Sequence, residues 1–80
     1  MTPAVTLYRR AGCHLCDEAR DALERVRADV PFALRLIDIE RDDELFKRYL
    51  ERIPVVCIDG EELFEYHVDE AALRRRLSLS

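Results

Sequence analysis

Two cysteines separated by two residues are the part of this sequence best suited to chemistry. Cys13 and Cys16 flank His14 and Leu15. A cysteine at the start of a helix faces unpaired backbone N–H groups and the positive end of the helix dipole, which favour thiolate over thiol. In C-x-x-C motifs the pKa of such a thiol falls to roughly 3.5–7.5, against about 8.5 for a free cysteine. The spacing therefore predicts that Cys13 attacks a disulfide and that Cys16, one turn later, resolves the mixed disulfide.

The surrounding apolar pattern places this motif between a strand and a helix. β-Forming residues at Ala4–Tyr8 predict a first strand. Apolar residues then recur at steps of three and four, which predicts an amphipathic helix that begins near Cys13 and is stopped by Pro31. These apolar positions are Cys16, Ala19, Leu23, Val26 and Val30. Open sheets with parallel strands usually carry their chemistry beyond the carboxyl ends of those strands, so the motif lies where a site is expected.

A second strand and a second helix follow. Phe32–Ile39 has the composition of a strand, and a helix between it and the first strand requires the two strands to be parallel. Asp42 is predicted to cap the next helix. The predicted buried side of that helix consists of Leu45, Phe46, Tyr49 and Leu50.

The last third of the chain predicts a hairpin and a final helix. Asp59-Gly60 is a strong hairpin-turn signal between Val55–Ile58 and Glu61–Phe64. Asp69 can cap a helix in which Leu73 and Leu77 share a face with Val68 or Ala72. The predicted order is β-α-β-α-β-β-α, an α/β fold.

Composition and charge limit the classes of function. The 80 residues are predicted to form a single domain, 1–80, with 49% apolar and 38% charged residues and no linker. A net charge of −4 and the lack of a basic face argue against a nucleic-acid partner. The run Arg74–Arg76 is read as the basic end of a helix.

Membrane and secretion signals are not evident in the sequence. The longest nearly apolar run, Ile53–Ile58, is too short to cross a bilayer, and the N-terminus has no apolar segment of the secretory kind. A cytoplasmic location is therefore expected. Three cysteines are an odd number, which argues against a disulfide framework and favours redox or metal chemistry for the close pair.

The chain resembles the glutaredoxin-like branch of the thioredoxin superfamily in three stretches. These are "RAGCHLC" at the first strand-to-helix turn, "RIPVV" at the third strand, and "DG" in the hairpin. The resemblance implies a thioredoxin-like fold with a four-stranded mixed sheet flanked by helices. It also implies that Pro54 is cis and faces the active cysteine, and that the backbone of Ile53 pairs with an extended substrate. Arg10 occupies the place of a lysine common in glutaredoxins and is a candidate to bind a glutathione carboxylate or to support the thiolate.

Two departures from the glutaredoxin pattern concern glutathione. His14-Leu15 replaces the usual Pro-Tyr between the cysteines, and residues 65–70 replace a glycine pair and a Ser/Thr-Asp segment, of which only Asp69 is matched. Glu65 and Glu70 would repel an anionic tripeptide unless a cation intervenes. The electron donor is therefore expected to be either glutathione or a flavoprotein thioredoxin reductase, with no tightly bound cofactor. The expected substrate is a disulfide-containing protein or a glutathione mixed disulfide.

Two other classes of function stay open at this point. Thiolates bind zinc, copper(I) and iron–sulfur clusters, but a structural zinc ion takes four ligands and Cys13 with Cys16 supplies only two. A redox-inactive module that holds an extended peptide in the groove around Pro54 is the other alternative.

Three further residues of chemical interest have weaker assignments. His14 either stabilises the thiolate as an imidazolium or is a solvated residue of the first helical turn. Cys57, in an apolar strand, is expected to be a buried core residue, with a third redox thiol as the alternative. His67 is expected to lie on the surface without an assigned role.

Overall fold

The computed structural model describes residues 2–78 and contains the predicted elements with one addition, a short 3₁₀ helix, η1. The ends of the predicted domain, residue 1 and residues 79–80, lie outside the described residues. The elements are β1 (Ala4–Arg9), α1 (His14–Asp29), β2 (Ala33–Asp38), η1 (Ile39–Arg41), α2 (Asp43–Tyr49), β3 (Val55–Ile58), β4 (Glu61–Glu65) and α3 (Glu70–Ser78).

The four strands form one mixed sheet in the order β2-β1-β3-β4. β1 and β2 are parallel, as the crossover helix requires, and β3 is antiparallel to both β1 and β4. The hairpin between β3 and β4 turns at Asp59 and Gly60, whose φ angles are 50° and 87°. Both residues have the positive φ that a tight two-residue hairpin turn requires, so the predicted turn is confirmed.

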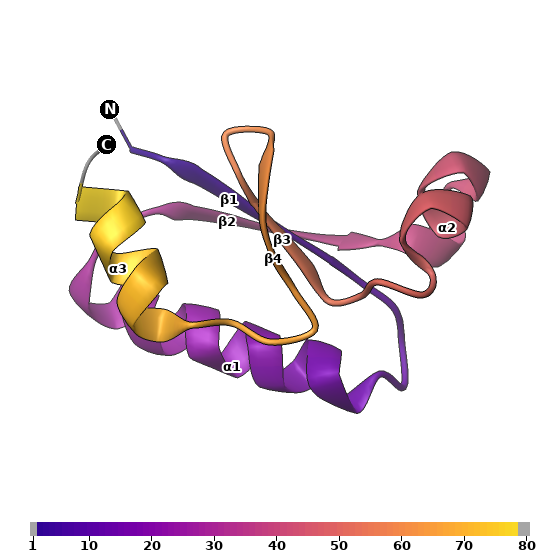
Figure 1. Cartoon of the computed structure of the whole chain (residues 1–80), viewed down its shortest axis with the longest axis horizontal. Coiled ribbons are helices and arrows are strands. Elements are labelled where there is room, and N and C mark those ends of the chain that lie inside the picture. The colour runs from indigo at the N-terminus through magenta and orange to yellow at the C-terminus, as the bar shows by residue number, and fades with distance from the viewer. Residues whose placement is uncertain (1, 79–80) are drawn as a thin grey trace.

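The two faces of the sheet carry separate apolar clusters. α1 and α3 lie together along one face, and α2 lies apart from them at one end of the sheet (Figure 1). The α1/α3 cluster contains Leu7, Leu23, Leu73 and Leu77, so the predicted buried faces of both helices are confirmed in their central residues. Val30 and Val68 lie just outside their helices and are half-buried against this cluster. The α2 cluster contains Cys16, Ile39, Tyr49, Ile53 and Cys57. Because side chains alternate along a strand, adjacent residues of β3 contribute to different clusters.

The predicted second strand is one residue too long at each end. β2 ends at Asp38, whose Oδ1 accepts a hydrogen bond from the Glu40 N–H at 2.9 Å. That bond caps η1, and Ile39 is turned into the α2 cluster with no exposed surface. A local side-chain bond to the backbone has therefore ended the strand where periodicity alone would have continued it.

Both predicted aspartate caps are confirmed. Asp42 Oδ1 accepts from the N–H groups of Glu44 and Leu45 at 2.9 and 3.2 Å, and Asp69 Oδ1 accepts from Ala72 N–H at 3.0 Å.

The predicted buried side of α2 is only partly correct. Tyr49 is buried, whereas Leu45, Phe46 and Leu50 are half-buried, because this short helix covers only one end of the sheet.

No helix within residues 2–78 combines the length and the apolar character needed to span a membrane.

Candidate active site

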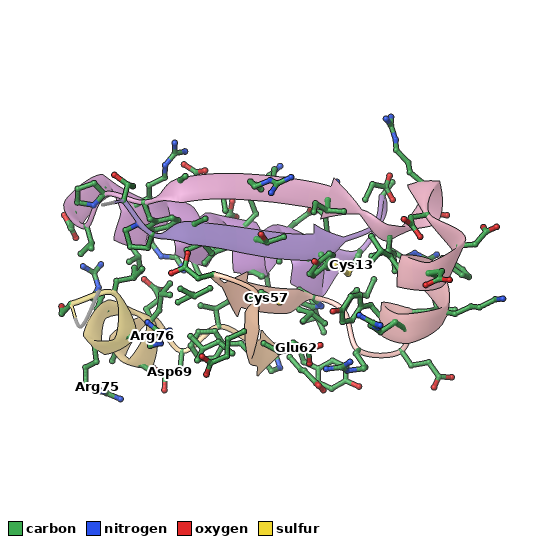
Figure 2. The ribbon with its side chains drawn as sticks, turned by 90° about the horizontal axis from the view of Figure 1, so that it is seen from above. Cys13, Cys57, Glu62, Asp69, Arg75 and Arg76 are labelled. Atoms are coloured by element: carbon green, nitrogen blue, oxygen red, sulfur yellow. A yellow bond between two sulfur atoms is a disulfide. The ribbon has the colours of Figure 1, made fainter. Side chains whose placement is uncertain are left out.

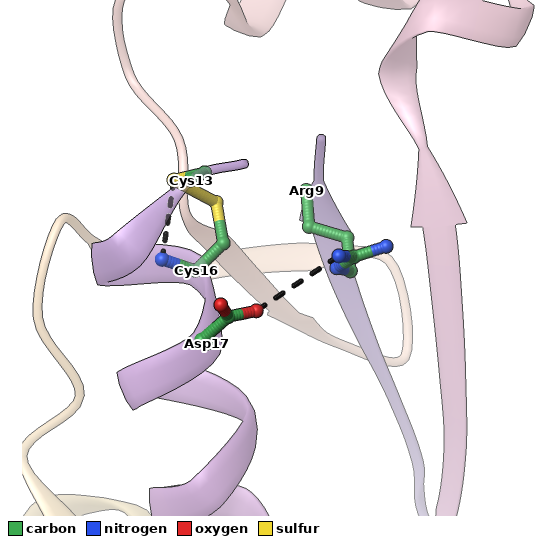
Figure 3. The surroundings of a disulfide bond; sticks show 4 residues. All are labelled: Arg9, Cys13, Cys16 and Asp17. Atoms are coloured by element: carbon green, nitrogen blue, oxygen red, sulfur yellow. Dashed lines mark hydrogen bonds and ion pairs between the residues drawn. A yellow bond between two sulfur atoms is a disulfide. The ribbon is translucent and has the colours of Figure 1, made fainter. Parts of the chain in front are cut away.

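Cys13 is the N-cap of α1, and its sulfur is bonded to that of Cys16 (Figure 3). The two Cα atoms are 5.2 Å apart. Cys13 Sγ also accepts a hydrogen bond from the Cys16 N–H at 3.2 Å, one of the N–H groups that have no partner within the first turn of a helix. The predicted position of Cys13 at the helix start is therefore confirmed. The same N–H would stabilise a thiolate at this sulfur after reduction.

The two sulfurs differ in their access to solvent. Cys16 has no exposed surface and packs in the α2 cluster, whereas Cys13 is half-buried at the edge of that cluster. An incoming disulfide can therefore reach Cys13 and cannot reach Cys16. A cysteine that attacks a substrate must be accessible, whereas a resolving cysteine can be buried, and Cys13 and Cys16 differ in this direction.

The peptide bond between Ile53 and Pro54 is cis, as the family resemblance implied. Ile53 belongs to the same apolar cluster as Cys13 and Cys16, so the structure brings these predicted site residues together. The Ile53 N–H donates to the Tyr49 carbonyl at 3.0 Å, and the Pro54 carbonyl accepts from the Tyr66 N–H at 2.9 Å. Among residues 2–78 the Ile53 carbonyl accepts no hydrogen bond, so this oxygen is the backbone group left for a substrate.

Arg9, which sequence reasoning did not single out, lies beside the cysteines (Figure 3). One of its guanidinium nitrogens is 3.9 Å from Asp17 Oδ1 in the first turn of α1, and its Nε is buried without a hydrogen-bond partner. The predicted Arg10 is half-buried and has no ion-pair partner within the described part of the chain. The structure therefore places Arg9 against the start of the cysteine-bearing helix and leaves Arg10 free to meet a ligand.

A polar network fixes the segment before Pro54 to strand β4. Arg52 donates to Glu62 and Glu65, with its Nε 2.8 Å from Glu65 Oε1. Tyr49 donates its hydroxyl to Glu62 Oε2 at 3.1 Å, and the Arg52 guanidinium lies 5.2 Å from the centre of the Tyr49 ring. The Tyr49 ring also stacks on Tyr8, with centroids 4.6 Å apart. Sequence reasoning missed this network because its members are distant in the chain.

Replacing Arg52 by glutamine should lower the melting temperature by at most a few degrees, because ion pairs between exposed side chains contribute little. The hydrogen bond from Arg52 is the main cause that lowers the pKa of Glu62, with a smaller contribution from Tyr49. A carboxyl whose pKa is lowered by folding stabilises the protein above its unfolded pKa, and this stabilisation is lost as the pH falls through the folded pKa. The difference between wild type and Arg52→Gln should therefore be larger at pH 7 than at pH 3, measured by thermal unfolding.

The matched control is Arg35→Gln, because Arg35 is exposed on β2, at the edge of the sheet opposite β4, and makes no ion pair within residues 2–78. A loss of stability in Arg52→Gln that is the same at both pH values would contradict the role given to Glu62.

The remaining residues of chemical interest are accounted for by their surroundings. Cys57 is buried on β3, as predicted, and burial followed by the charge of Glu62 raises the pKa of its thiol (Figure 2). His14 is exposed and lies 3.5 Å from Glu18, four residues further along α1. His67 is exposed, as predicted.

The two carboxylates expected to repel glutathione each have a cation. Glu65 accepts from Arg52, and Glu70 Oε2 accepts from Arg25 at 2.8 Å. The sequence left such compensation open, and both arginines come from other elements of the fold. Among residues 2–78 no three His, Cys, Asp or Glu side chains gather into a group that could hold a metal ion.

Comparison with known proteins gives a consistent assignment. The family description that matches residues 4–78 is the glutaredoxin-like domain (DUF836). An uncharacterized protein of Mycobacterium tuberculosis is 31% identical over 83 residues, covering 98% of this chain and 86% of that protein.

Solved structures agree with this match. The X-ray structure of protein XcR50 from X. campestris has a TM-score of 0.77 and 38% identity, and the alignment covers 95% of this chain and 97% of that one. A mutant thioredoxin from Halobacterium salinarum has a TM-score of 0.69 at 22% identity, with coverage of 96% and 73%. At that identity the second likeness concerns the fold alone.

Proposed function

Because this chain belongs to the family of the glutaredoxin-like domain and has the thioredoxin fold, we propose that it is a dithiol–disulfide oxidoreductase. The observation that carries the proposal is the bonded pair itself. Cys13 caps a helix with a partly exposed sulfur, and its bonding partner Cys16 is fully buried. This supports a reaction that starts at Cys13 and is completed within the protein by Cys16.

The proposed reaction begins from the reduced protein. The Cys13 thiolate attacks one sulfur of a substrate disulfide, forms a mixed disulfide, and releases the other half of the substrate as a thiolate. Cys16 then loses its proton and attacks the Cys13 sulfur. The new bond joins Cys13 to Cys16, and the second half of the substrate leaves as a thiolate that takes up a proton. The substrate has gained two electrons, and the protein has lost them.

The substrate is proposed to lie along Pro54, next to Cys13. The Ile53 carbonyl supplies an acceptor for one N–H of an extended peptide, while the Ile53 N–H is already bonded to Tyr49. Pairing through this residue would therefore use one hydrogen bond. Arg10 is proposed to meet a carboxylate of the substrate, and its lack of an ion pair among the described residues supports this role.

The electron donor is proposed to be glutathione or a flavoprotein thioredoxin reductase, in the reducing cytoplasm. The pairing of Glu65 with Arg52 and of Glu70 with Arg25 reduces the repulsion that the sequence suggested for glutathione. No tightly bound cofactor takes part in the proposed reaction, since the pair of cysteines carries both electrons.

Replacing Cys16 by serine should trap the first intermediate. The variant keeps the attacking thiolate and lacks the resolving thiol, so one half of a substrate disulfide should stay bound to Cys13. Intact-mass spectrometry without added reductant would show the adduct, and dithiothreitol should remove it.

The converse variant, Cys13→Ser, is the matched control for this capture. It retains Cys16, which has no exposed surface, and should form the adduct far more slowly. Equal capture by the two variants would contradict the assignment of Cys13 as the attacking residue.

A further inference from the structure

Tyr66 has a backbone conformation that tyrosine rarely adopts. Its φ of 65° lies in the left-handed region, where a residue with a Cβ atom is strained. Hydrogen bonds hold it there from both ends: its N–H donates to the Pro54 carbonyl at 2.9 Å, and its hydroxyl donates to the Glu51 carbonyl at 2.5 Å. Strained residues that the surrounding structure fixes in this way are concentrated at functional sites.

The ring of Tyr66 is fixed at the surface near the candidate active site. Its side chain is a large apolar group with 44% exposure, although its backbone and its hydroxyl are both bonded. It lines a groove of roughly 160 Å³ together with Leu15, which lies between the two cysteines in the sequence. The groove extends along α1 to Val68 and Glu70 at the start of α3. Tyr66 therefore links the Pro54 segment to a groove that begins beside the cysteine pair.

The charges of this groove disfavour an anionic ligand. Its titratable lining residues are the carboxylates of Glu18 and Glu70, the guanidinium of Arg25 and the imidazole of His67. Arg25 is bonded to Glu70 at 2.8 Å, and among residues 2–78 the one ion-pair partner of Glu18 is His14, at 3.5 Å. Beside these charges the groove offers two large apolar side chains at the end nearest the cysteine pair, Leu15 and Tyr66, and smaller ones further along, Ala19, Ala22 and Val68.

We propose that Tyr66 determines substrate specificity, with its ring and Leu15 receiving an uncharged apolar side chain next to the substrate cysteine. The preferred substrate is then a disulfide in a peptide or protein rather than the anionic tripeptide glutathione. This inference rests on the proposed function, because it concerns the disulfide that Cys13 attacks. A ring held rigid before binding loses little freedom on contact, so its contact surface is converted efficiently into affinity.

The test measures the first chemical step alone, in the Cys16→Ser background. The probes are oxidised glutathione and the disulfide of an acetylated, amidated Gly-Cys-Phe peptide, and the readout is the second-order rate of adduct formation at Cys13 by quenched mass spectrometry. The reaction of each disulfide with N-acetylcysteine amide corrects for its intrinsic reactivity. With Tyr66 intact, we expect a corrected preference of about tenfold for the peptide, a typical effect of one aromatic contact.

Three variants separate the ring from the backbone and the hydroxyl. Tyr66→Asn keeps a residue that tolerates positive φ but removes the ring, and it should lower the preference to within about twofold of unity. Tyr66→Phe keeps the ring and the backbone bond to Pro54 and loses only the bond to Glu51, so it should retain most of the preference. Leu36→Asn removes a comparably exposed apolar side chain, at 47%, from β2 and should also retain it.

The outcomes distinguish this inference from the proposed function. An unchanged preference in Tyr66→Asn, or no preference with Tyr66 intact, would overturn the role of Tyr66. If Cys13 reacts with neither disulfide faster than N-acetylcysteine amide does, the result would count against the proposed oxidoreductase. The ratio of the two rates at Cys13 would still show whether the groove prefers the peptide.

Discussion

Cys13→Ser should abolish turnover in a coupled assay in which NADPH consumption follows the reduction of a small mixed disulfide. A serine hydroxyl is not ionised at neutral pH and cannot form the mixed disulfide, so the reaction has no first step. Cys16 cannot substitute, because its sulfur has no exposed surface. The assay would be run once with glutathione and glutathione reductase and once with thioredoxin reductase, so that the active pairing also identifies the donor.

The matched control for this loss is Cys57→Ala, which removes the third thiol from β3. Cys57 is buried, and the raised pKa of its thiol keeps it protonated, so this variant should keep the turnover of the wild type. Activity that survives in Cys13→Ser and disappears in Cys57→Ala would mean that the wrong sulfur has been assigned.

Leu23→Ala should be the most destabilising of the substitutions considered. Leu23 has no exposed surface and packs between α1 and the sheet with Leu73 and Val56. Deleting a buried leucine side chain costs about 2–5 kcal/mol. The whole free energy of unfolding of a chain of this length is roughly 4–12 kcal/mol, with small domains near the lower end. Urea unfolding followed by circular dichroism should show a much lower midpoint, or a chain unfolded in buffer.

Leu36→Ala is the control for that experiment, because it deletes the same atoms from an exposed position. Leu36 is 47% exposed on β2, at the edge of the sheet, and its loss should change the free energy of unfolding by no more than about 0.5 kcal/mol. Similar midpoints for the two variants would show that the α1/α3 cluster does not determine stability.

The part of the site that could be predicted from the sequence is local. The Cys13 cap, the aspartate caps and the Asp59-Gly60 turn each depend on residues within a few positions of one another, and the structure confirms them. The cis bond before Pro54 is different, because residue chemistry alone gives a low prior for it and only the family resemblance implied it.

Arg9 shows why the rest could not be predicted. The first strand was expected to end at Tyr8, but β1 continues through Arg9, and the alternation of side chains then puts Arg9 on the same face as Leu7. That face is covered by α1, which supplies Asp17. A strand end displaced by one residue therefore decides which of two adjacent arginines meets the cysteine-bearing helix.

The groove residues and the Arg52 network were missed for a related reason. Tyr66 has a positive φ, but it comes directly after a strand and is neither a glycine nor an asparagine. The sequence therefore does not indicate this backbone conformation. The partners of Arg52 lie on β4, and the whole of β3 and the hairpin turn separate them from Arg52 in the sequence. Pairings of this kind depend on the register of the hairpin, which includes an irregularity between Val56 and Cys57.

The burial of Cys16 also constrains the order in which partners can meet this protein. In the proposed reaction only one sulfur is accessible, so the molecule that supplies electrons and the molecule that receives them would both have to react at Cys13. The two would therefore not be bound at the same time, and each would have to leave before the other arrives. Such an exchange is ping-pong, so an excess of either partner occupies the form of the protein that the other requires. The ratio of donor to acceptor in the cell, as well as the affinity for each, would then set the rate of electron flow.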